Sequence, residues 1–467
     1  MPGAMNPHIF RRYDIRGVAD RDLTHETVSH IARAFGSHLV KTLQLQRPSL
    51  VLGRDIRPSS ERIHKSLVAA LLGSGVSIAD IGVVTTPICY FSVLHFKHAA
   101  GIMVTGSHNP TEYNGLKFVI GRQSFFGDDI QNLRALIEKK DFVTGQGQIQ
   151  TIEIIPAYRS YLKQLFQFKK RWKVVVDSGN GTAGLVAPQL LRELGHEVVE
   201  LFSKPDSRFP HHHPDPTVEG NLQHAMAKVR EVGADVGLAF DGDGDRLGVV
   251  DEQGTIVWGD KLLILFSRFI LEQHPGAKFV ADVKCSRLFF EDVARHGGEA
   301  IMWKTGHALI KQKLKEVDAL LGGEMSGHMF FADRYFGFDD GLYAGLRVLE
   351  ILDQTGRKLS QLLSDVPRTF STPEIRIDYP DDEKFQVVER VRGYFKKSRH
   401  STFDLDGVRI DFGDGWGLLR ASNTQPVLVM RFEASTAERL AELKRLVEDK
   451  VREFSPPHVS IPQWEKG

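Results

Sequence analysis

One structural unit recurs three times in this chain, and it constrains the fold more than any other feature. Each unit reads as a buried strand, an amphipathic helix that ends at glycine, and a second strand, and the units begin at Leu50, Lys173 and Lys278. Two strands joined through a helix lie parallel in one sheet, with the helix on its face. The units start a domain's length apart, which favours three similar domains over a short-period solenoid. An α/β protein without domain repetition remains the alternative.

The C-terminal part of the chain has a different pattern, which predicts an α+β domain. Strands are expected at 374–378, 408–412, 416–420 and 427–432, and long helices at 383–397 and 436–453. The expected fold class is therefore α/β, with three similar α/β domains that have mixed, largely parallel sheets, plus the C-terminal α+β domain. At about 150 residues per domain, the 467 residues allow three or four domains. We place the domains at residues 1–150, 151–253, 254–367 and 368–467.

Composition argues against several classes of protein. Lys and Arg total 60 and Asp and Glu total 59, and the net charge of +1 disfavours a nucleic-acid partner. No run of 18 apolar residues exists, and no signal peptide is visible at the start, so no membrane partner is expected. The two cysteines, Cys89 and Cys285, lie far apart in the sequence and imply no disulfide framework. This cysteine usage fits a reducing compartment, and the cytoplasm is the expected location.

The most specific motif is Asp-Gly-Asp-Gly-Asp-Arg at 241–246, between two apolar strands. In a straight strand, side chains two residues apart face the same way but lie about 6.5 Å apart. That is too far for oxygens that share one Mg²⁺ at about 2.0–2.1 Å. The interleaved glycines let the backbone curl, so that the carboxylates of Asp241, Asp243 and Asp245 converge. Three hard oxygen ligands predict a Mg²⁺ site, and Arg246 indicates a phosphate beside it.

Two other interpretations of this motif remain open. It partly fits a calcium-binding EF-hand, with Glu252 at the twelfth position. However, Arg246 stands where that loop needs glycine, and the flanking segments read as strands rather than helices. A solvated acidic turn is the second alternative. The nearby run His211–His213 lies among three prolines, so we interpret it as a loop and not as a metal site.

A second motif, Thr-Gly-Ser-His-Asn-Pro at 105–110, follows an apolar strand. Ser107 therefore lies at the carboxyl end of a strand, where α/β proteins bind ligands. The G-x-S-x-G turn of hydrolases is absent, so acyl transfer is unsupported. Beside a Mg²⁺ site, the better interpretation is a serine that carries phosphate, with His108 assisting and Lys117 stabilising charge. An ordinary turn and a solvated lysine are the alternatives.

Two further loops offer polar groups for a phosphorylated sugar. In an extended segment, Glu324, Ser326 and His328 would project to one side and suit sugar hydroxyls. Between two C-terminal strands, the segment 420–426 contains an arginine and three short polar side chains, which can form an anion cradle. The segment Thr305–His307 closes a strand of the third unit and would face the same kind of cleft. A glycine-rich loop and a plain β-turn remain alternatives.

Together these loops resemble those of the α-D-phosphohexomutase superfamily. The resemblance runs in family order from Tyr-Asp-Ile-Arg-Gly at 13–17 to the loop at Arg420, and so covers nearly the whole chain. The serine loop, the Gly-Glu-Met-Ser-Gly-His loop and the last loop are most similar to the bacterial phosphomannomutase/phosphoglucomutase branch. The resemblance implies four domains around a central cleft. It also implies reversible conversion of hexose 1-phosphate and hexose 6-phosphate, of mannose, glucose or both, through a phosphoserine and a 1,6-bisphosphate.

The resemblance implies roles for individual residues as well. One Mg²⁺ would be held by Ser107, Asp241, Asp243 and Asp245. The catalytic residues would be Ser107, His108, Lys117, Arg16 and Arg246. The substrate-binding residues would be Tyr13, Arg16, Lys284, Thr305, Gly306, His307, Glu324, Ser326, His328, Arg420, Ser422, Asn423 and Thr424. A phosphosugar is the expected partner, glucose 1,6-bisphosphate or an equivalent the expected activator, and a monomer the expected state.

Two other activities remain in competition at this point. A phosphoglucosamine mutase would use the same fold on an amino sugar. A Mg²⁺-dependent sugar phosphatase or a phosphosugar-binding protein would use the same loops without returning phosphate to a substrate.

Overall fold

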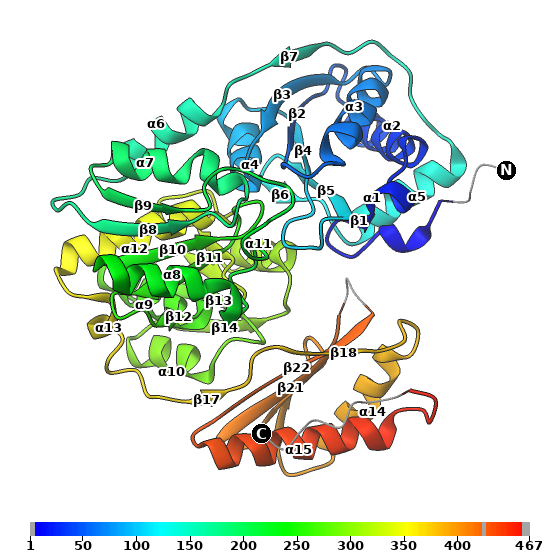
Figure 1. Ribbon diagram of the computed structural model, residues 1–467. Coiled ribbons are helices and arrows are strands. Elements are labelled where there is room, and N and C mark those ends of the chain that lie inside the picture. The colour runs from blue at the N-terminus through cyan, green and yellow to red at the C-terminus, as the bar shows by residue number, and fades with distance from the viewer. Residues whose placement is uncertain (1–4, 423–425, 460–467) are drawn as a thin grey trace.

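A computed structural model describes residues 5–422 and 426–459, and these form four sheets in sequence order (Figure 1). The first sheet has the order β1-β5-β4-β2-β3-β7, with β6 paired to β5. Its strands are β1 (Ile15–Val18), β2 (Ser49–Arg54), β3 (Ser77–Val83), β4 (Ala100–Val104), β5 (Tyr113–Ile120), β6 (Gln123–Ser124) and β7 (Ile149–Thr151). Its helices are α1 (Ala19–Asp22), α2 (His25–Lys41), α3 (Ser60–Leu72), α4 (Thr86–His95) and α5 (Asp128–Lys139).

The second sheet has the order β12-β11-β10-β8-β9, and the third has the order β14-β13-β15-β16. The second contains β8 (Lys173–Asp177), β9 (Glu197–Leu201), β10 (Val236–Phe240), β11 (Leu247–Asp251) and β12 (Ile256–Val257), with helices α6 (Ile155–Leu165), α7 (Ala187–Glu193) and α8 (Glu219–Val232). The third contains β13 (Lys278–Asp282), β14 (Glu299–Trp303), β15 (Leu321–Gly323) and β16 (Met329–Phe331), with helices α9 (Gly259–Gln273), α10 (Arg287–Arg295), α11 (His307–Glu316), α12 (Gly341–Thr355) and α13 (Leu359–Leu362).

The same four-strand pattern occurs in all three of these sheets. The orders β5-β4-β2-β3, β11-β10-β8-β9 and β16-β15-β13-β14 are equivalent. In each, three parallel strands are followed by one antiparallel return strand. The predicted fold class of similar α/β units with mixed sheets is confirmed. Because the pattern repeats, the three loops singled out in the sequence lie at equivalent turns, β4–β5, β10–β11 and β15–β16.

The fourth sheet is antiparallel, in the order β17-β22-β21-β20-β19, with β18 paired to β22. Its strands are β17 (Phe370–Ser371), β18 (Ile375–Asp378), β19 (Ser401–Phe403), β20 (Val408–Asp411), β21 (Gly415–Ala421) and β22 (Val427–Ala434), and its helices are α14 (Lys384–Lys396) and α15 (Ala437–Phe454). The predicted α+β pattern is confirmed. The strands β17 and β19 were not predicted, because they are only two and three residues long.

Core packing joins the first three sheets more closely than it joins the fourth. One apolar cluster includes Phe91 beside the first sheet, Leu238 in the second and Phe266 beside the third. Helix α12 is buried within this cluster. The fourth sheet has its own apolar core and meets the third at a small cluster that includes Val283 and Trp416. The serine loop (105–110), the acidic loop (241–246) and the loop at 324–328, which we call the sugar loop after its expected ligand, therefore rest on one shared core. Across the described parts of the chain, no helix combines the length and apolar character needed to cross a membrane.

Candidate active site

The serine loop of the first sheet contacts the acidic loop of the second. Ser107 follows β4, and its Oγ donates a hydrogen bond to Asp241 Oδ2 at 3.0 Å. The same Oγ lies 3.2 Å from His108 Nδ1. The acidic loop joins β10 to β11, which form an antiparallel hairpin. The EF-hand interpretation is therefore wrong, because no pair of helices flanks this loop.

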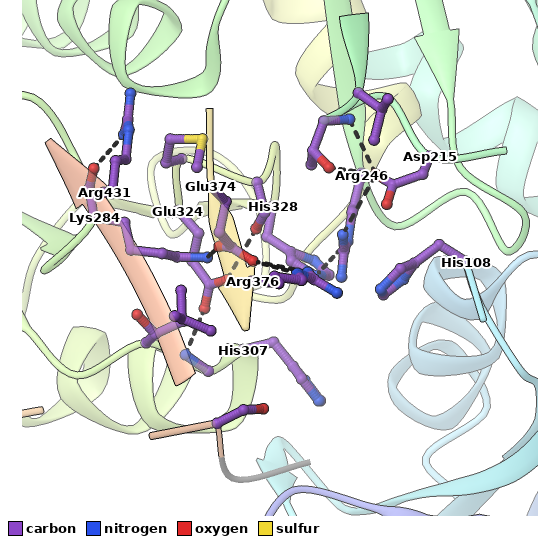
Figure 2. Close-up of a pocket in the computed structure, with 18 of the residues that line it drawn as sticks. His108, Asp215, Arg246, Lys284, His307, Glu324, His328, Glu374, Arg376 and Arg431 are labelled. Carbon is purple, nitrogen blue, oxygen red and sulfur yellow. Dashed lines mark hydrogen bonds and ion pairs between the residues drawn. The ribbon is translucent and has the colours of Figure 1, made fainter. Parts of the chain in front are cut away.

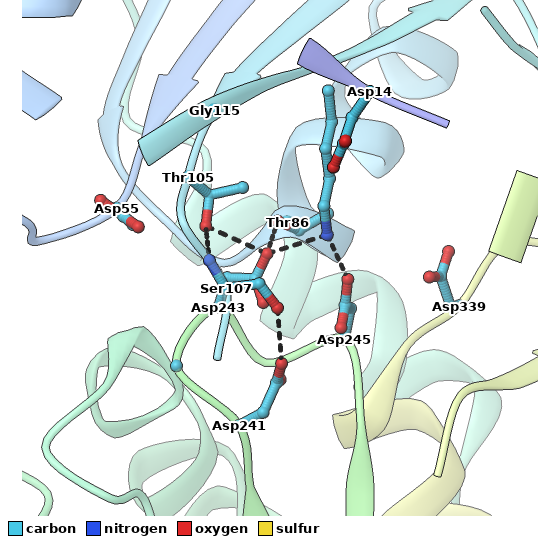
Figure 3. A network of polar contacts seen from close by, with 12 residues as sticks. Asp14, Asp55, Thr86, Thr105, Ser107, Gly115, Asp241, Asp243, Asp245 and Asp339 are labelled. Atoms are coloured by element: carbon cyan, nitrogen blue, oxygen red, sulfur yellow. Dashed lines mark hydrogen bonds and ion pairs between the residues drawn. The ribbon is translucent and has the colours of Figure 1, made fainter. Parts of the chain in front are cut away.

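The three aspartates of the acidic loop converge (Figure 3), and Lys117 bonds two of them. Asp241, Asp243 and Asp245 are fully buried, and each offers an oxygen within 4.8 Å of the other two. Lys117 Nζ, from β5, donates to Asp243 Oδ2 at 3.0 Å and to Asp245 Oδ2 at 2.5 Å. The alternatives of a solvated acidic turn and a solvated lysine are both wrong, because all four side chains are buried.

The residues of this loop fit a small divalent cation. The Oδ1 atoms of Asp243 and Asp245 are buried and have no hydrogen-bond partner. Burial, together with the charges of Asp245 and Asp243, raises the pKa of Asp241 well above its usual value. Burial would also raise the pKa of Asp243, but Lys117 more than offsets it and lowers that pKa. Three carboxylates with one ammonium leave an excess of negative charge, and hard oxygen ligands suit Mg²⁺.

Close backbone contacts explain the residue types in the two loops. A Cβ on Gly242 would lie 2.6 Å from the carbonyl oxygen of Ser107, so only glycine allows this approach. Ser107 itself has a φ of 50°, in the left-handed region. The buried guanidinium of Arg57 donates to the carbonyl oxygens of Ser107 and Asn109 at 2.8 and 2.5 Å. The sequence analysis missed Arg57, although its place after β2, at the same edge of the sheet, is a signal for it.

A cavity of about 800 Å³ adjoins Ser107 and is lined from all four parts of the chain (Figure 2). The described candidate residues that line it are Tyr13, Arg16, Ser107, His108, Lys117, Arg246, Lys284, Thr305, Gly306, His307, Glu324, Ser326, His328, Arg420 and Ser422. Asn423 and Thr424 lie outside the described residues. The structure thus brings together side chains that are separated by hundreds of residues in the sequence.

The sugar loop differs from the extended segment that the sequence analysis expected. Glu324 to His328 is a tight turn between β15 and β16, in which Glu324 N donates to His328 O at 2.9 Å. Gly327 has a φ of 91°, and a Cβ there would lie 2.5 Å from the carbonyl oxygen of Leu247. Glu324 accepts hydrogen bonds from Gly306 N at 2.8 Å and from Ser326 Oγ at 3.0 Å. The side chains still reach the cavity, but they do so from a turn and not from one face of a strand.

Contacts across the cavity tie the fourth sheet to the third. Arg420 Nε donates to Asp406 Oδ2 at 3.0 Å, and that oxygen also accepts from Thr305 N at 3.1 Å. From the first domain, Tyr13 donates its hydroxyl to Thr305 O at 2.7 Å. Lys284 Nζ donates to Glu374 Oε2 at 2.9 Å. Arg420 therefore lies in the cavity wall, where Asp406 links it to Thr305 of the third domain.

Several cavity residues were missed by the sequence analysis. Glu374 and Arg376 line the cavity at β18, and Arg431 lines it from β22. Arg431 is a buried cation within an apolar strand, and this local pattern could have found it. The run His211–His213 is a loop, as predicted, and His213 Nε2 contacts the carbonyl oxygen of His108.

Burial sets the charge of the basic groups in the cavity. Burial, with Arg246 and Arg16 adding to it, lowers the pKa of His108 well below its usual value. Burial and Lys311 lower the pKa of His307 in the same way. Burial would lower the pKa of Lys117 too, but Asp243 and Asp245 outweigh it and raise that pKa. Near pH 7 both imidazoles are therefore held in the neutral form, while Lys117 remains a cation.

Models of the four domains of one protein family match consecutive parts of the chain. The phosphoglucomutase/phosphomannomutase alpha/beta/alpha domains I, II and III match residues 7–144, 156–254 and 258–370, and the C-terminal domain matches residues 374–450. The chain belongs to the phosphoglucomutase/phosphomannomutase family. The resemblance stated from the sequence motifs is thereby confirmed. The members of this family depend on Mg²⁺, which agrees with the acidic loop as a metal site.

Relatives in this family match nearly the whole chain. The phosphomannomutase/phosphoglucomutase of Pseudomonas aeruginosa is 46% identical over 444 residues, which cover 95% of each chain. The phosphoglucomutase of Neisseria gonorrhoeae is 42% identical and covers 97% of this chain and 98% of its own. The crystal structure of a phosphoglucomutase/phosphomannomutase family protein from Burkholderia thailandensis superposes with a TM-score of 0.89 at 40% identity, covering 97% of this chain and 99% of its own.

Proposed function

We propose that this protein interconverts the 1-phosphate and the 6-phosphate of a hexose, mannose or glucose or both, through phosphorylated Ser107 and a 1,6-bisphosphate. One observation carries the proposal. Ser107 Oγ lies 3.0 Å from Asp241 in a cavity that also contains the sugar loop and the anion-binding arginine. The names of the relatives, phosphomannomutase/phosphoglucomutase and phosphoglucomutase, support this activity.

The reaction consists of two phosphoryl transfers in opposite directions. In the first, the bond from phosphorus to Ser107 Oγ breaks as a bond to the free sugar hydroxyl forms, and that hydroxyl loses its proton. The bisphosphate then reverses its orientation, and its other phosphoryl group returns to Ser107. His108 is the first candidate for the proton, because its neutral imidazole lies 3.2 Å from Oγ; Arg16 and Lys117 are the others.

Positive side chains stabilise the transferring group. Lys117 and Arg246 line the cavity beside Ser107, and both keep their charge in this buried setting. The oxygens of Asp241, Asp243, Asp245 and Ser107 would hold one Mg²⁺, which when bound offsets charge on the phosphoryl oxygens. Between transfers, Lys117 keeps two of the carboxylates paired.

The remaining residues bind the sugar and its second phosphate. We assign the sugar hydroxyls to Glu324, Ser326 and His328, and the unreacted phosphate to Arg420, Ser422, Asn423 and Thr424. Further contacts with the substrate are assigned to Tyr13, Arg16, Lys284, Thr305, Gly306 and His307. A volume of about 800 Å³ is within the size range of small-molecule pockets and leaves room for a hexose bisphosphate to turn.

The proposal extends to the state of the enzyme. All four domains of the chain contribute residues to the cavity, and we propose a monomer as the active unit. Loss of the bisphosphate would leave Ser107 without phosphate, so glucose 1,6-bisphosphate or an equivalent should act as an activator. The two free thiols, Cys89 and Cys285, are buried, which agrees with a reducing location such as the cytoplasm.

A mass measurement and a substrate panel test the function together. Untreated protein should carry one phosphate on Ser107, detected by intact-protein and peptide mass spectrometry. Mannose 1-phosphate or glucose 1-phosphate should give the 6-phosphate without release of inorganic phosphate. Free phosphate in each turnover would instead identify a phosphatase. A clear preference for glucosamine 1-phosphate would identify a phosphoglucosamine mutase.

Replacing Glu324 with alanine is expected to increase escape of the bisphosphate as well as weaken substrate binding. Glu324 positions Gly306 N and Ser326 Oγ, and its contacts can serve both orientations of the sugar. Activity should therefore depend more strongly on added glucose 1,6-bisphosphate, and isotope-labelled bisphosphate should appear in solution. The control is Glu252→Ala, which removes a carboxylate that bonds Ser360 outside the cavity. If the activator dependence of Glu324→Ala is unchanged, the loop binds the sugar but does not retain the bisphosphate.

A further inference from the structure

A chain of mostly buried polar side chains leads from Lys311 through Asp339 and His328 to Arg246 at the cavity. Lys311 Nζ donates to Asp339 Oδ1 at 3.0 Å, and Asp339 Oδ2 lies 3.0 Å from His328 Nδ1. On its other side, His328 Nε2 accepts from Arg246 Nε at 3.0 Å. Asp339 is fully buried, lies beyond Asp245 of the acidic loop with an oxygen within 4.8 Å of one of its oxygens (Figure 3), and is not among the residues that line the cavity. Its influence on the cavity therefore passes through its neighbours there, and His328 is the nearest of them.

The donors and acceptors in this chain allow only one arrangement of protons. An arginine side chain only donates, so His328 Nε2 must accept. The neutral imidazole then carries its proton on Nδ1, which faces the carboxylate of Asp339. Burial would raise the pKa of Asp339, but Lys311 and His328 more than offset it and keep that pKa well below its usual value. Lys311 thus donates to Oδ1 of the ionised carboxylate, and Nδ1 of His328 lies 3.0 Å from its Oδ2.

We infer that Asp339, held by Lys311, is a positioning residue that keeps His328 in the Nδ1–H tautomer and so holds the guanidinium of Arg246 at the cavity. The inference rests on the proposed function, in which Arg246 faces the transferring phosphoryl group. Arg246 lies in the cavity opposite His108 (Figure 2), and its backbone N donates to Asp241 Oδ1 at 3.2 Å. The wrong tautomer would place two N–H donors against each other and turn the guanidinium away.

A second metal ion is the competing explanation for these side chains. Asp245, His328 and Asp339 do have oxygen and nitrogen atoms within 4.8 Å of one another. However, Lys311 already contacts Asp339, Lys117 contacts Asp245 and Arg246 contacts His328. A cation there would face three positive side chains. These side chains are therefore better explained as contacts that hold His328 in one tautomer.

Asparagine at position 339 provides a specific test, because Lys311 decides which way the new amide turns. Lys311 only donates, so the amide oxygen of Asn would face Lys311 and its NH₂ would face His328 Nδ1. His328 would then have to accept at Nδ1 and carry its proton on Nε2, against Arg246. Adding Lys311→Gln removes this constraint, since the glutamine amide can offer its oxygen to the asparagine NH₂. The asparagine oxygen can then face His328 again.

The expected result is a change of tautomer that tracks activity. In Asp339→Asn, ¹⁵N NMR of histidine-labelled protein should show His328 moving from Nδ1–H to Nε2–H. The value of kcat should fall about 10- to 100-fold, as for other supporting carboxylates, with little change in KM. The double variant Asp339→Asn/Lys311→Gln should recover the Nδ1–H tautomer and part of kcat. Asp353→Asn is the control, because Asp353 bonds Lys169 N, Lys170 N and Trp172 Nε1 away from the cavity and should keep a normal kcat.

Three outcomes would overturn the inference. They are an Nε2–H tautomer of His328 in the wild-type protein, a normal kcat in Asp339→Asn, and a double variant that regains the tautomer without regaining kcat. The ¹⁵N NMR spectrum of the wild-type protein shows the tautomer of His328 directly, so it tests the first outcome even if Asp339→Asn fails to fold. Wild-type protein without hexose phosphomutase activity would instead contradict the proposed function, and the spectrum would still report on the tautomer.

Discussion

Replacing Ser107 with alanine is expected to abolish phosphoryl transfer, with a loss of turnover of about 1,000-fold or more. The Ser107 hydroxyl lies within hydrogen-bonding distance of both Asp241 and His108, at 3.0 and 3.2 Å. The φ of 50° at Ser107 and the hydrogen bond from Arg57 to its carbonyl oxygen hold the loop in this position. Steady-state conversion of glucose 1-phosphate, together with the intact mass, measures the effect. The variant should carry no phosphate at this position.

The control for Ser107→Ala is Ser92→Ala. Ser92 is also buried, but its hydroxyl donates to Ile88 O within α4 and lies outside the cavity. This variant should retain both the phosphate on Ser107 and normal turnover. Turnover in Ser107→Ala within a few-fold of wild type would contradict a phosphoserine enzyme, whatever its substrate.

The local pattern of apolar and polar residues was enough to predict most of the fold. Buried runs such as Lys173–Asp177 alternate with amphipathic helices that end at glycine, and this order alone implies parallel strands with crossover helices. The pattern could not show which strand would return antiparallel. That depends on how β4, β10 and β15 each end at the sheet edge, where the next strand pairs back beside them. Those turns are also where the functional loops lie.

The candidate site could be predicted where several functional residues lie close together in the sequence. The three alternating aspartates are such a case, and the structure brings their oxygens together. Arg57 and Asp339 are single charged residues outside any dense motif, and their roles depend on contacts with residues farther along the chain. The sugar loop shows a different limit. The sequence analysis assumed that the segment 324–328 continues as an extended strand, with alternate side chains on one side. Instead, Gly327 adopts a positive φ and closes a turn.

Replacing Asp243 with asparagine is expected to lower turnover by about 100- to 1,000-fold, because one anion of the metal site is lost while the shape is kept. Asp243 is the most connected of the three aspartates. Its Oδ2 accepts from Lys117 at 3.0 Å, from Thr86 Oγ1 at 2.6 Å and from Thr105 Oγ1 at 3.2 Å. An asparagine oxygen can keep hydrogen bonds to the two threonines. Without the charge, however, Lys117 is drawn toward Asp245, and the remaining ligands attract Mg²⁺ more weakly.

The response of thermal stability to Mg²⁺ separates this effect from misfolding. A cation that binds only the folded state raises Tm, and the rise grows with the cation concentration relative to its Kd. Wild-type Tm should therefore rise with Mg²⁺ and fall on chelation. In Asp243→Asn the rise should be smaller. The Tm without Mg²⁺ should fall, since the effect of burial is outweighed by Lys117, which lowers the pKa of Asp243 in the folded protein, and the substitution removes this stabilising charge. Asp251→Asn is the matched control, because Oδ1 of this buried carboxylate accepts from Gln253 N and Thr255 N in a turn. An amide oxygen can keep both bonds, so the response of Tm to Mg²⁺ should be unchanged. Near-normal turnover of Asp243→Asn at saturating Mg²⁺, with an unchanged rise in Tm, would show that the three aspartates do not form the metal site.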